Sequence, residues 1–239
     1  MEEILVFPAG TGEAILFAEQ YLKQHGIALV DHPTPEVTHL LLDVPVKQIP
    51  LQLLERLPEK ITVVGGNLNH RSLEGYRKID LLRDEDYLAK NAAITADCAL
   101  RVAAANSKKV FSGTAVLVIG WGRIGKCLAA LLKAAGCEVT VAARKSADQA
   151  ILRALGFETE DPVALEQINR FDMIFNTAPA PVLDEKQLSG CPKTLKVDIA
   201  SVKGLAGDDV IWARGLPGKY APESSGKLIA ETFLKEVTS

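Results

Sequence analysis

Residues 116–148 read VLVIGWGRIGKCLAALLKAAGCEVTVAARKSAD, and this stretch decides the fold of the larger part of the chain. The apolar run at 115–119 predicts a buried strand, and residues 123–135 place apolar side chains at helical period. Gly136 is a helix stop signal, and residues 138–142 predict a second strand. A strand, a helix and a second strand in this order predict a βαβ unit in a parallel sheet.

Three glycines join the first strand to the helix in the pattern GxGxxG. The first permits a tight turn, the second lets a pyrophosphate approach the backbone, and the third lets the helix pack close to the sheet. A glycine-rich turn without a ligand is the alternative, but the flanking strand and helix are the context that the motif requires. We therefore predict that a dinucleotide binds to Gly120, Trp121, Gly122, Arg123, Ile124 and Gly125.

A basic stretch, Arg144-Lys145-Ser146, follows the second strand. Proteins that bind NAD usually carry an acidic residue about 20 residues past the glycines, where it bonds the ribose. No acidic residue lies between Val139 and Ala147. A guanidinium binds a 2′-phosphate through two parallel bonds, an ammonium adds charge, and the serine hydroxyl can donate. We expect NADP as the cofactor; NAD is the alternative if both cations are simply solvated.

Composition limits the remaining possibilities. The chain has 239 residues, 48% of them hydrophobic and 24% charged, which is ordinary for a globular protein. Its net charge of −3 gives no reason to expect nucleic acid or an anionic membrane as a partner. No apolar run approaches the ~20 residues that span a bilayer, and the acidic start MEEI lacks a secretory n-region, so we expect a cytoplasmic protein. Four scattered cysteines predict no metal site.

The chain divides into two predicted domains. Residues 1–88 alternate short apolar strands with helical segments and predict a small flavodoxin-like α/β domain. Residues 89–221 carry the glycine loop and predict a Rossmann-type doubly wound parallel sheet. The apolar face of residues 222–239 predicts a last helix, which we expect to pack back on the first domain. The expected fold class is α/β, with a Rossmann-type domain and a smaller N-terminal α/β domain.

Cap and turn signals add several local predictions. Residues 48–57 predict a short helix, and residues 86–106 predict a helix that is interrupted near Asn91–Thr95, with Thr95 as the N-cap of its second part. Ser146 is expected to cap another helix, with Gln149 completing a capping box. Asp161-Pro162 is expected to open a short helix, and Gly215–Lys219 a turn.

Ligands of a doubly wound sheet lie beyond the carboxyl ends of its strands. After the strand at 172–176 come Asn176, Thr177, Ala178 and Pro179, which we expect to border the nicotinamide ribose; loop termination by the prolines is the alternative. After the strand at 195–199, Ser201 and Lys203 are candidates for contact near the nicotinamide. Asp198 has two equal interpretations: it orients the cofactor, or it bonds a backbone loop.

Further motifs resemble the dipicolinate synthase A subunit family of spore-forming bacteria, relatives of the 2-hydroxyacid dehydrogenases. The similar stretches are NAAITAD (91–97), the glycine loop, ARKSAD (143–148), DMIFNTAP (172–179), DIAS (198–201) and GLPGKYAP (215–222). The resemblance implies an active site in a cleft between two domains, with residues 1–88 as the substrate domain. It also implies transfer of a hydride from a dihydrodipicolinate-type precursor to NADP, a partner in the form of a flavoprotein-like B subunit, and a homo-oligomer.

A dicarboxylate substrate needs cations, and Arg71, Lys203 and Lys219 are the candidates, although each can be an ordinary solvated charge. All four histidines precede residue 71, and His70 follows a predicted strand end, where functional residues gather. We take these four residues as candidate catalytic groups. Two alternatives remain open. One is another NAD(P)-dependent dehydrogenase of a small carboxylate, and the other is a non-catalytic NADP-binding regulatory protein.

Overall fold

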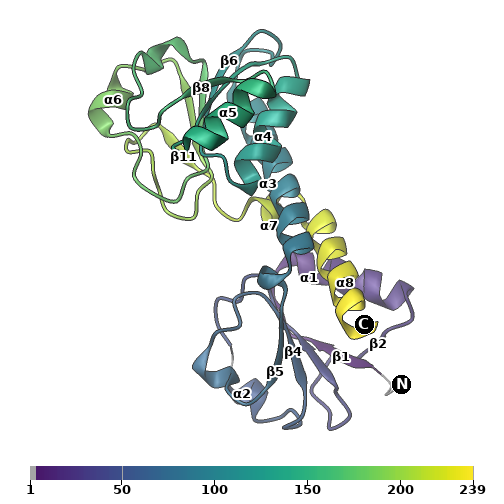
Figure 1. Cartoon of the computed structure of the whole chain (residues 1–239). Helices are drawn as coiled ribbons and strands as arrows, with labels where there is room; N and C mark the ends of the chain where they lie inside the picture. Colours follow the sequence, from purple (N-terminus) through teal and green to yellow (C-terminus); the bar gives the residue numbers. More distant parts are fainter. Residues whose placement is uncertain (1–3, 50, 239) are drawn as a thin grey trace. The chain divides into compact units, whose positions relative to one another are not determined.

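The computed structural model describes residues 4–49 and 51–238, which form two units (Figure 1). One unit contains residues 1–91 together with 217–239, and the other contains residues 92–216. The ranges expected for the first domain, the short helix near residue 50 and the last helix include residues 1–3, 50 and 239, which lie outside the described part.

The first unit is built on a five-stranded parallel sheet in the order β2-β1-β3-β4-β5. This is the 2-1-3-4-5 order of flavodoxin-like sheets. Its strands are β1 (Leu5–Pro8), β2 (Ala28–Leu29), β3 (His39–Leu41), β4 (Thr62–Gly65) and β5 (Arg77–Asp80). Its helices are α1 (Glu13–Gln24), α2 (Leu51–Leu54), η1 (Arg71–Leu73), η2 (Leu81–Arg83) and α8 (Pro222–Thr238).

Helix α8 packs on α1, although the two are far apart in sequence (Figure 1). Gly226 permits the close approach, because a Cβ there would lie 2.3 Å from the carbonyl oxygen of Ala14. At the other end of α8, the Lys235 ammonium donates to Asp84 at 2.9 Å and to Asp86 at 3.2 Å. The last helix therefore belongs to the first unit.

The second unit is built on a six-stranded parallel sheet in the order β11-β10-β9-β6-β7-β8. Read from β8, this is the 3-2-1-4-5-6 order of the Rossmann fold, so the expected fold class is confirmed. Its strands are β6 (Ala115–Ile119), β7 (Glu138–Ala142), β8 (Glu158–Glu160), β9 (Met173–Asn176), β10 (Leu195–Asp198) and β11 (Val210–Trp212). The remaining helices are α3 (Glu85–Asn106), α4 (Arg123–Ala134), α5 (Ser146–Ala154), η3 (Ile168–Arg170), α6 (Glu185–Ser189) and α7 (Leu216–Tyr220).

Burial on both faces explains the apolar strands of this sheet. Leu117 and Ile119 pack in one cluster with Phe171 and Leu188, while Leu128 of α4 is also fully buried. Parallel strands covered on both sides read as nearly continuous hydrophobic runs, as residues 115–119 do.

Two expectations about helix starts are wrong. Helix α3 runs without interruption, and Thr95 is a buried residue in its interior rather than an N-cap. The stretch holds neither proline nor glycine, and its alanines favour continuation of the helix. Ser146 is the first residue of α5, not its cap; the N-cap is Lys145, without a side-chain bond. The Gln149 amide donates instead to the Ala143 carbonyl at 2.7 Å, so no capping box forms.

Three other local expectations also need correction. The short helix expected in 48–57 is limited to the four residues of α2. Asp161-Pro162 opens a turn rather than a helix, because the Asp161 carboxylate accepts a bond from the Val163 N–H at 2.9 Å. Gly215–Lys219 is not a turn throughout, since most of it forms helix α7, whose first turn tolerates Pro217.

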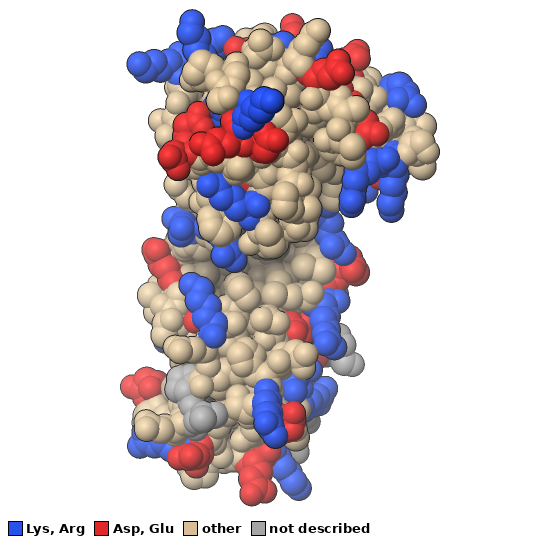
Figure 2. Space-filling model, turned by 90° about the vertical axis from the view of Figure 1, so that its left-hand side faces the viewer, with Lys and Arg blue, Asp and Glu red and all other residues tan. Residues whose placement is uncertain are grey.

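The surface carries both signs of charge. Figure 2 shows Lys and Arg beside Asp and Glu over the face in view, in keeping with the net charge of −3. Within the described ranges, no helix combines the length and apolar character needed to cross a membrane.

Candidate functional site

The carboxyl ends of four neighbouring strands bring the predicted cofactor segments to one edge of the second sheet. Main-chain bonds tie each strand end to the next: Gly120 N–H to the Ala142 carbonyl at 2.9 Å, Thr177 N–H to Ile119 at 2.8 Å, and Ile199 N–H to Asn176 at 2.9 Å. The segments that follow β6, β7, β9 and β10 are therefore adjacent. They are 120–125, 144–146, 176–179 and 200–203.

One side of the glycine loop packs tightly on the protein backbone, and the other side is exposed to solvent. Gly120 has a φ of 103°, and a Cβ on Gly125 would lie 2.2 Å from the Gly120 carbonyl oxygen. Gly122 is exposed, and a Cβ there would meet nothing within 4 Å. Gly122 is also the N-cap of α4 and has no side-chain cap. The loop thus presents bare backbone at a helix N-terminus, which fits the approach of a pyrophosphate.

The other residues of the loop are held along α4. The Trp121 ring packs edge to face on Phe157, with 6.0 Å between centroids. The Lys126 ammonium lies 5.8 Å from the centroid of the same indole. Arg123 is exposed and Ile124 is half-buried. The indole therefore rests on neighbouring protein, and the backbone of the loop is left as the surface toward a ligand.

The basic stretch after β7 is exposed and carries uncompensated charge. Arg144, Lys145 and Ser146 are all exposed. Among the described residues, no carboxylate lies within ion-pair distance of either cation. Arg170 of the same unit, by contrast, pairs with Glu160. Two unpaired cations beside the glycine loop suit an anionic group of a bound dinucleotide.

Asn176 and Thr177 have structural bonds that fix the loop after β9. The buried Asn176 amide donates to the Ala178 carbonyl at 3.0 Å and to Asp198 at 3.1 Å, and its oxygen accepts from the Ala178 N–H at 3.0 Å. The Thr177 hydroxyl donates to the Ile119 carbonyl at 2.9 Å. Pro179 is exposed and Ala178 is half-buried. Ala178 and Pro179, at the far end of this loop, are therefore left half-buried and exposed. Contact of the loop with the cofactor stays a prediction.

Asp198 bonds a backbone loop, as one of its two interpretations expects; a role in orienting the cofactor stays a prediction. Its buried carboxylate accepts from the N–H groups of Ala200 at 3.0 Å, Gly204 at 2.7 Å and Leu205 at 2.9 Å, besides the Asn176 amide. A Cβ at Gly204 would lie 2.4 Å from the Ala180 carbonyl oxygen. Sequence reasoning included a backbone loop as one interpretation of Asp198 but could not name its partners, because they come from separate segments.

The substrate-side candidates fall in both units. Ser201 and Lys203 are exposed in the second unit, and the Lys203 ammonium donates to the carbonyl of Gly207 at 3.2 Å. The first unit holds the other three candidates: half-buried His70 before η1, exposed Arg71 in η1, and exposed Lys219 in α7. Their catalytic roles stay predictions.

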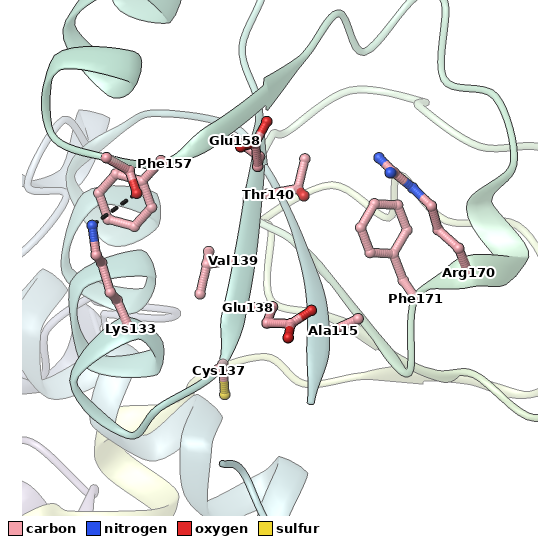
Figure 3. Close-up of a pocket in the computed structure, with 11 residues that line it drawn as sticks. Ala115, Lys133, Cys137, Glu138, Val139, Thr140, Phe157, Glu158, Arg170 and Phe171 are labelled. Carbon is pink, nitrogen blue, oxygen red and sulfur yellow. Dashed lines mark hydrogen bonds between the residues drawn. The ribbon is translucent and has the colours of Figure 1, made fainter. Parts of the chain in front are cut away.

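A pocket of about 560 Å³ lies at the opposite edge of the second sheet (Figure 3). The first residues of β6, β7 and β8 line it, together with Lys133 and Arg170. Its cations are engaged, because Lys133 donates to the carbonyls of Leu155 and Gly156 at 2.8 Å and Arg170 pairs with Glu160. This hollow is therefore separate from the candidate cofactor edge.

The four cysteines are free thiols, and three of them lie in buried settings that do not activate them. Burial raises the pKa of Cys98, Cys137 and Cys191, so these three remain protonated at neutral pH. In the described part of the chain, no three metal-ligating side chains of the His, Cys, Asp or Glu type come together.

Comparison with known proteins supports the cofactor edge. The family model described as D-isomer specific 2-hydroxyacid dehydrogenase, NAD binding domain, matches residues 91–194. The A subunit of dipicolinate synthase from Bacillus subtilis (strain 168) is 30% identical over 199 residues, which cover 76% of this chain and 66% of that protein.

Solved structures show the same fold. The A subunit of dipicolinate synthase from Bacillus halodurans has a TM-score of 0.85 and 22% identity, covering 100% of this chain and 99% of that chain. The corresponding dipicolinate synthase structure from Bacillus subtilis has a TM-score of 0.81 and 21% identity, covering 100% and 96%. The transhydrogenase from Sinorhizobium meliloti reaches 0.73 with 16% identity, covering 98% and 94%.

These findings confirm the resemblance that the motifs indicated. The matched range 91–194 includes the glycine loop, the basic stretch after β7 and the loop after β9. The chain is similar to the A subunit of dipicolinate synthase, and its residues 91–194 match the NAD-binding domain family of the D-isomer specific 2-hydroxyacid dehydrogenases.

Proposed function

We propose that the chain is an NADP-dependent oxidoreductase that oxidises a dihydrodipicolinate-type cyclic dicarboxylate to dipicolinate. The observation that carries the proposal is the open backbone of Gly122 near Arg144 and Lys145, two cations without a carboxylate partner among the described residues, at one edge of a Rossmann sheet. The substrate class rests on 30% identity to a protein named as the A subunit of dipicolinate synthase.

In this proposal each cofactor segment binds one part of NADP. The N–H groups of the glycine loop hold the pyrophosphate. Arg144 pairs with the 2′-phosphate through two parallel bonds, Lys145 adds a point charge, and the Ser146 hydroxyl donates. Ala178, Pro179 and Ser201 border the nicotinamide end. The bound nicotinamide supplies a hydride acceptor, and the protein residues position it.

Oxidation of the dihydro ring removes a hydride and a proton. The hydride passes to NADP, the proton passes to a base or to water, and the ring becomes aromatic. Aromatisation favours loss of both, which lowers the demand on the base, and His70 is the candidate acceptor. Arg71, Lys203 and Lys219 are the candidates that neutralise the two carboxylates.

The proposal includes two kinds of protein partner. The similar Bacillus subtilis protein is named a subunit, so we propose that a flavoprotein-like B subunit binds this chain, which also self-associates into a homo-oligomer. Light scattering of the purified chain measures its mass in solution. Co-purification with a B subunit encoded nearby tests the second partner.

The cofactor is tested by titration with NADP and NAD. Arg144→Ala is expected to weaken NADP binding about tenfold while NAD binding is unchanged, because one charge-assisted bidentate contact is lost. Arg153→Ala is the matched control, since Arg153 is exposed in the helix that follows Arg144 and donates to Thr159 at 3.1 Å. Equal affinities of the wild type for both cofactors would contradict the preference for NADP.

Turnover is tested with NADP and freshly generated dihydrodipicolinate precursor. Absorbance of the reduced cofactor and of the pyridine product should rise together. Turnover of a different carboxylate alone would favour another dehydrogenase. Tight NADP binding without turnover of any carboxylate would favour a regulatory protein.

A further inference from the structure

Trp212 and Arg214, at the end of edge strand β11, have no part in the assignments above. The Trp212 side chain is 44% exposed, an unusual setting for a large aromatic ring. Its indole N–H donates to the Ala200 carbonyl at 3.2 Å, so the ring is held in place rather than free. The Arg214 guanidinium carbon lies 5.2 Å from the centroid of the ring, which makes the two side chains one cation–aromatic pair.

The pair lies at the carboxyl edge of the second sheet. Strand β11 runs parallel to β10, with Trp212 opposite Asp198, the last residue of β10. Ala200 is two residues beyond that end, so the indole N–H reaches past the strand toward the loop. This is the edge that also carries the glycine loop and the basic stretch, where ligands of such sheets lie.

Arg214 is a cation without an acidic partner in the described part of the chain. It is exposed, and no carboxylate among the described residues pairs with it, whereas Arg101 pairs with Asp97 and Arg170 with Glu160. A guanidinium that lies over an aromatic ring still has N–H groups available for a carboxylate. Arg214 therefore offers a bidentate donor next to a flat apolar wall.

The loop beside the pair favours Arg214 over the lysine in that loop. Val202, two residues beyond Ala200, is 53% exposed and adds apolar surface. The ammonium of Lys203 donates to Gly207 within its own loop, whereas Arg214 has no such bond among the described residues. Sequence reasoning missed Arg214 because nothing in its local pattern distinguishes it from a solvated charge at a strand end.

We propose that Trp212 and Arg214 form the subsite that takes a planar cyclic carboxylate, with the ring of the ligand against the indole and one carboxylate on the guanidinium. The inference rests on the proposed function for the class of substrate. It adds a substrate-binding site within the second unit that does not depend on Arg71, Lys203 or Lys219.

The chain has two tryptophans, Trp121 and Trp212, which permits a direct test. The difference in emission between the wild type and Trp212→Phe isolates the fluorescence of Trp212 and leaves Trp121 of the glycine loop unchanged. Saturable quenching by pyridine-2,6-dicarboxylate, with NADP present, is the expected result. The neutral pyridine-2,6-dicarboxamide should not quench, because it has no charge for Arg214. Binding of the dicarboxylate by calorimetry without any change in Trp212 fluorescence would overturn the proposal.

Substitutions of Arg214 provide the second measurement. Arg214→Ala should raise the Kd for the dicarboxylate and the KM for the dihydro substrate about tenfold, with kcat changed little, since a ground-state contact is lost. Arg214→Lys should recover part of the loss, and Arg153→Ala is the control with unchanged values. Unchanged KM in Arg214→Ala during normal turnover would overturn only the subsite. Binding of the dicarboxylate at Trp212 without turnover would support the subsite and contradict the proposed function.

Discussion

Two glycine-rich loops begin a helix after a central strand, one in each unit, and they differ in what covers their backbone. In the first unit, PAGTGE (8–13) joins β1 to α1, and the Asp43 carboxylate accepts from the N–H groups of Thr11 at 3.0 Å and Gly12 at 2.9 Å. In the second, GWGRIG (120–125) joins β6 to α4, and no carboxylate among the described residues accepts from Gly122 N–H. The first loop is closed by an anion of the chain itself, and the second is open.

The difference originates in the neighbouring strand. Asp43 follows β3, the strand beside β1, and its carboxylate reaches across to the loop. The equivalent neighbour of β6 is β9, and it is followed by Thr177, whose hydroxyl donates to a carbonyl, that of Ile119. A donor bound to a carbonyl leaves the N–H groups of the loop available. Glycine content alone therefore does not create an anion site; the residue that ends the adjacent strand decides whether the helix N-terminus is available.

The largest effect is expected for Gly125→Ala. The new methyl group would lie 2.2 Å from the Gly120 carbonyl oxygen, and backbone must shift to accept it. Overpacking of this kind costs about 3 kcal/mol, offset by about 1 kcal/mol from the better helix propensity of alanine. We expect the free energy of unfolding of the second unit to fall by about 2 kcal/mol, with loss of NADP binding.

Urea unfolding followed by tryptophan fluorescence measures this effect in the right place. Trp121 and Trp212 both lie in the second unit, so their emission reports on that unit. The control must be a glycine that alanine can replace without backbone strain. Gly26 has a φ of +80° and is unsuitable, so Gly122→Ala is the matched control. Equal midpoints for Gly125→Ala and the wild type would contradict the close contact.

The second effect concerns the open side of the loop. In Gly122→Ala the methyl group meets no protein atom within 4 Å, and alanine is a poorer N-cap than glycine, so the free energy of unfolding should fall by no more than about 1 kcal/mol. The same methyl group occupies the space that a pyrophosphate must approach, and we expect NADP affinity to fall about tenfold. Titration of the folded variant measures this. Unchanged affinity would mean that the phosphates do not bind against Gly122.

Local patterns were sufficient to predict the fold of the second unit and to place the candidate cofactor segments at the carboxyl ends of its strands. The glycine loop, its strand and its helix are contiguous, and Arg144–Ser146 follow directly after the next strand. What could not be predicted depends on residues far apart in sequence. Asp43 and Gly12 are 31 residues apart, and Asn176 and Asp198 are 22 residues apart. A pattern over a short stretch of sequence therefore cannot indicate either hydrogen bond. The proposed role of Arg214 could not be predicted from sequence for the same reason. Arg214 stands out by its lack of an acidic partner within the described ranges, which only the structure reveals.

Cap signals failed where another bond competed with them. Thr95 has the side chain of an N-cap, yet the alanine-rich helix continues through it. Gln149 has the spacing of a capping box, yet its amide donates to Ala143. Each cap contributes about 1 kcal/mol to helix stability, so a competing interaction of similar free energy is enough to override it.

The smallest effect is expected for Asp43→Ala, which opens the first loop without touching the second. Loss of the carboxylate leaves Thr11 and Gly12 N–H groups to water, and removal of such a cap costs about 1 kcal/mol. Asp43→Asn keeps one acceptor oxygen and should lose less. Far-UV circular dichroism during urea unfolding should show the loss, while tryptophan emission and NADP affinity stay at wild-type values, because both tryptophans and the open loop belong to the second unit. A fall in NADP affinity in Asp43→Ala would show that the closed loop takes part in cofactor binding, and the contrast between the two loops would then be wrong.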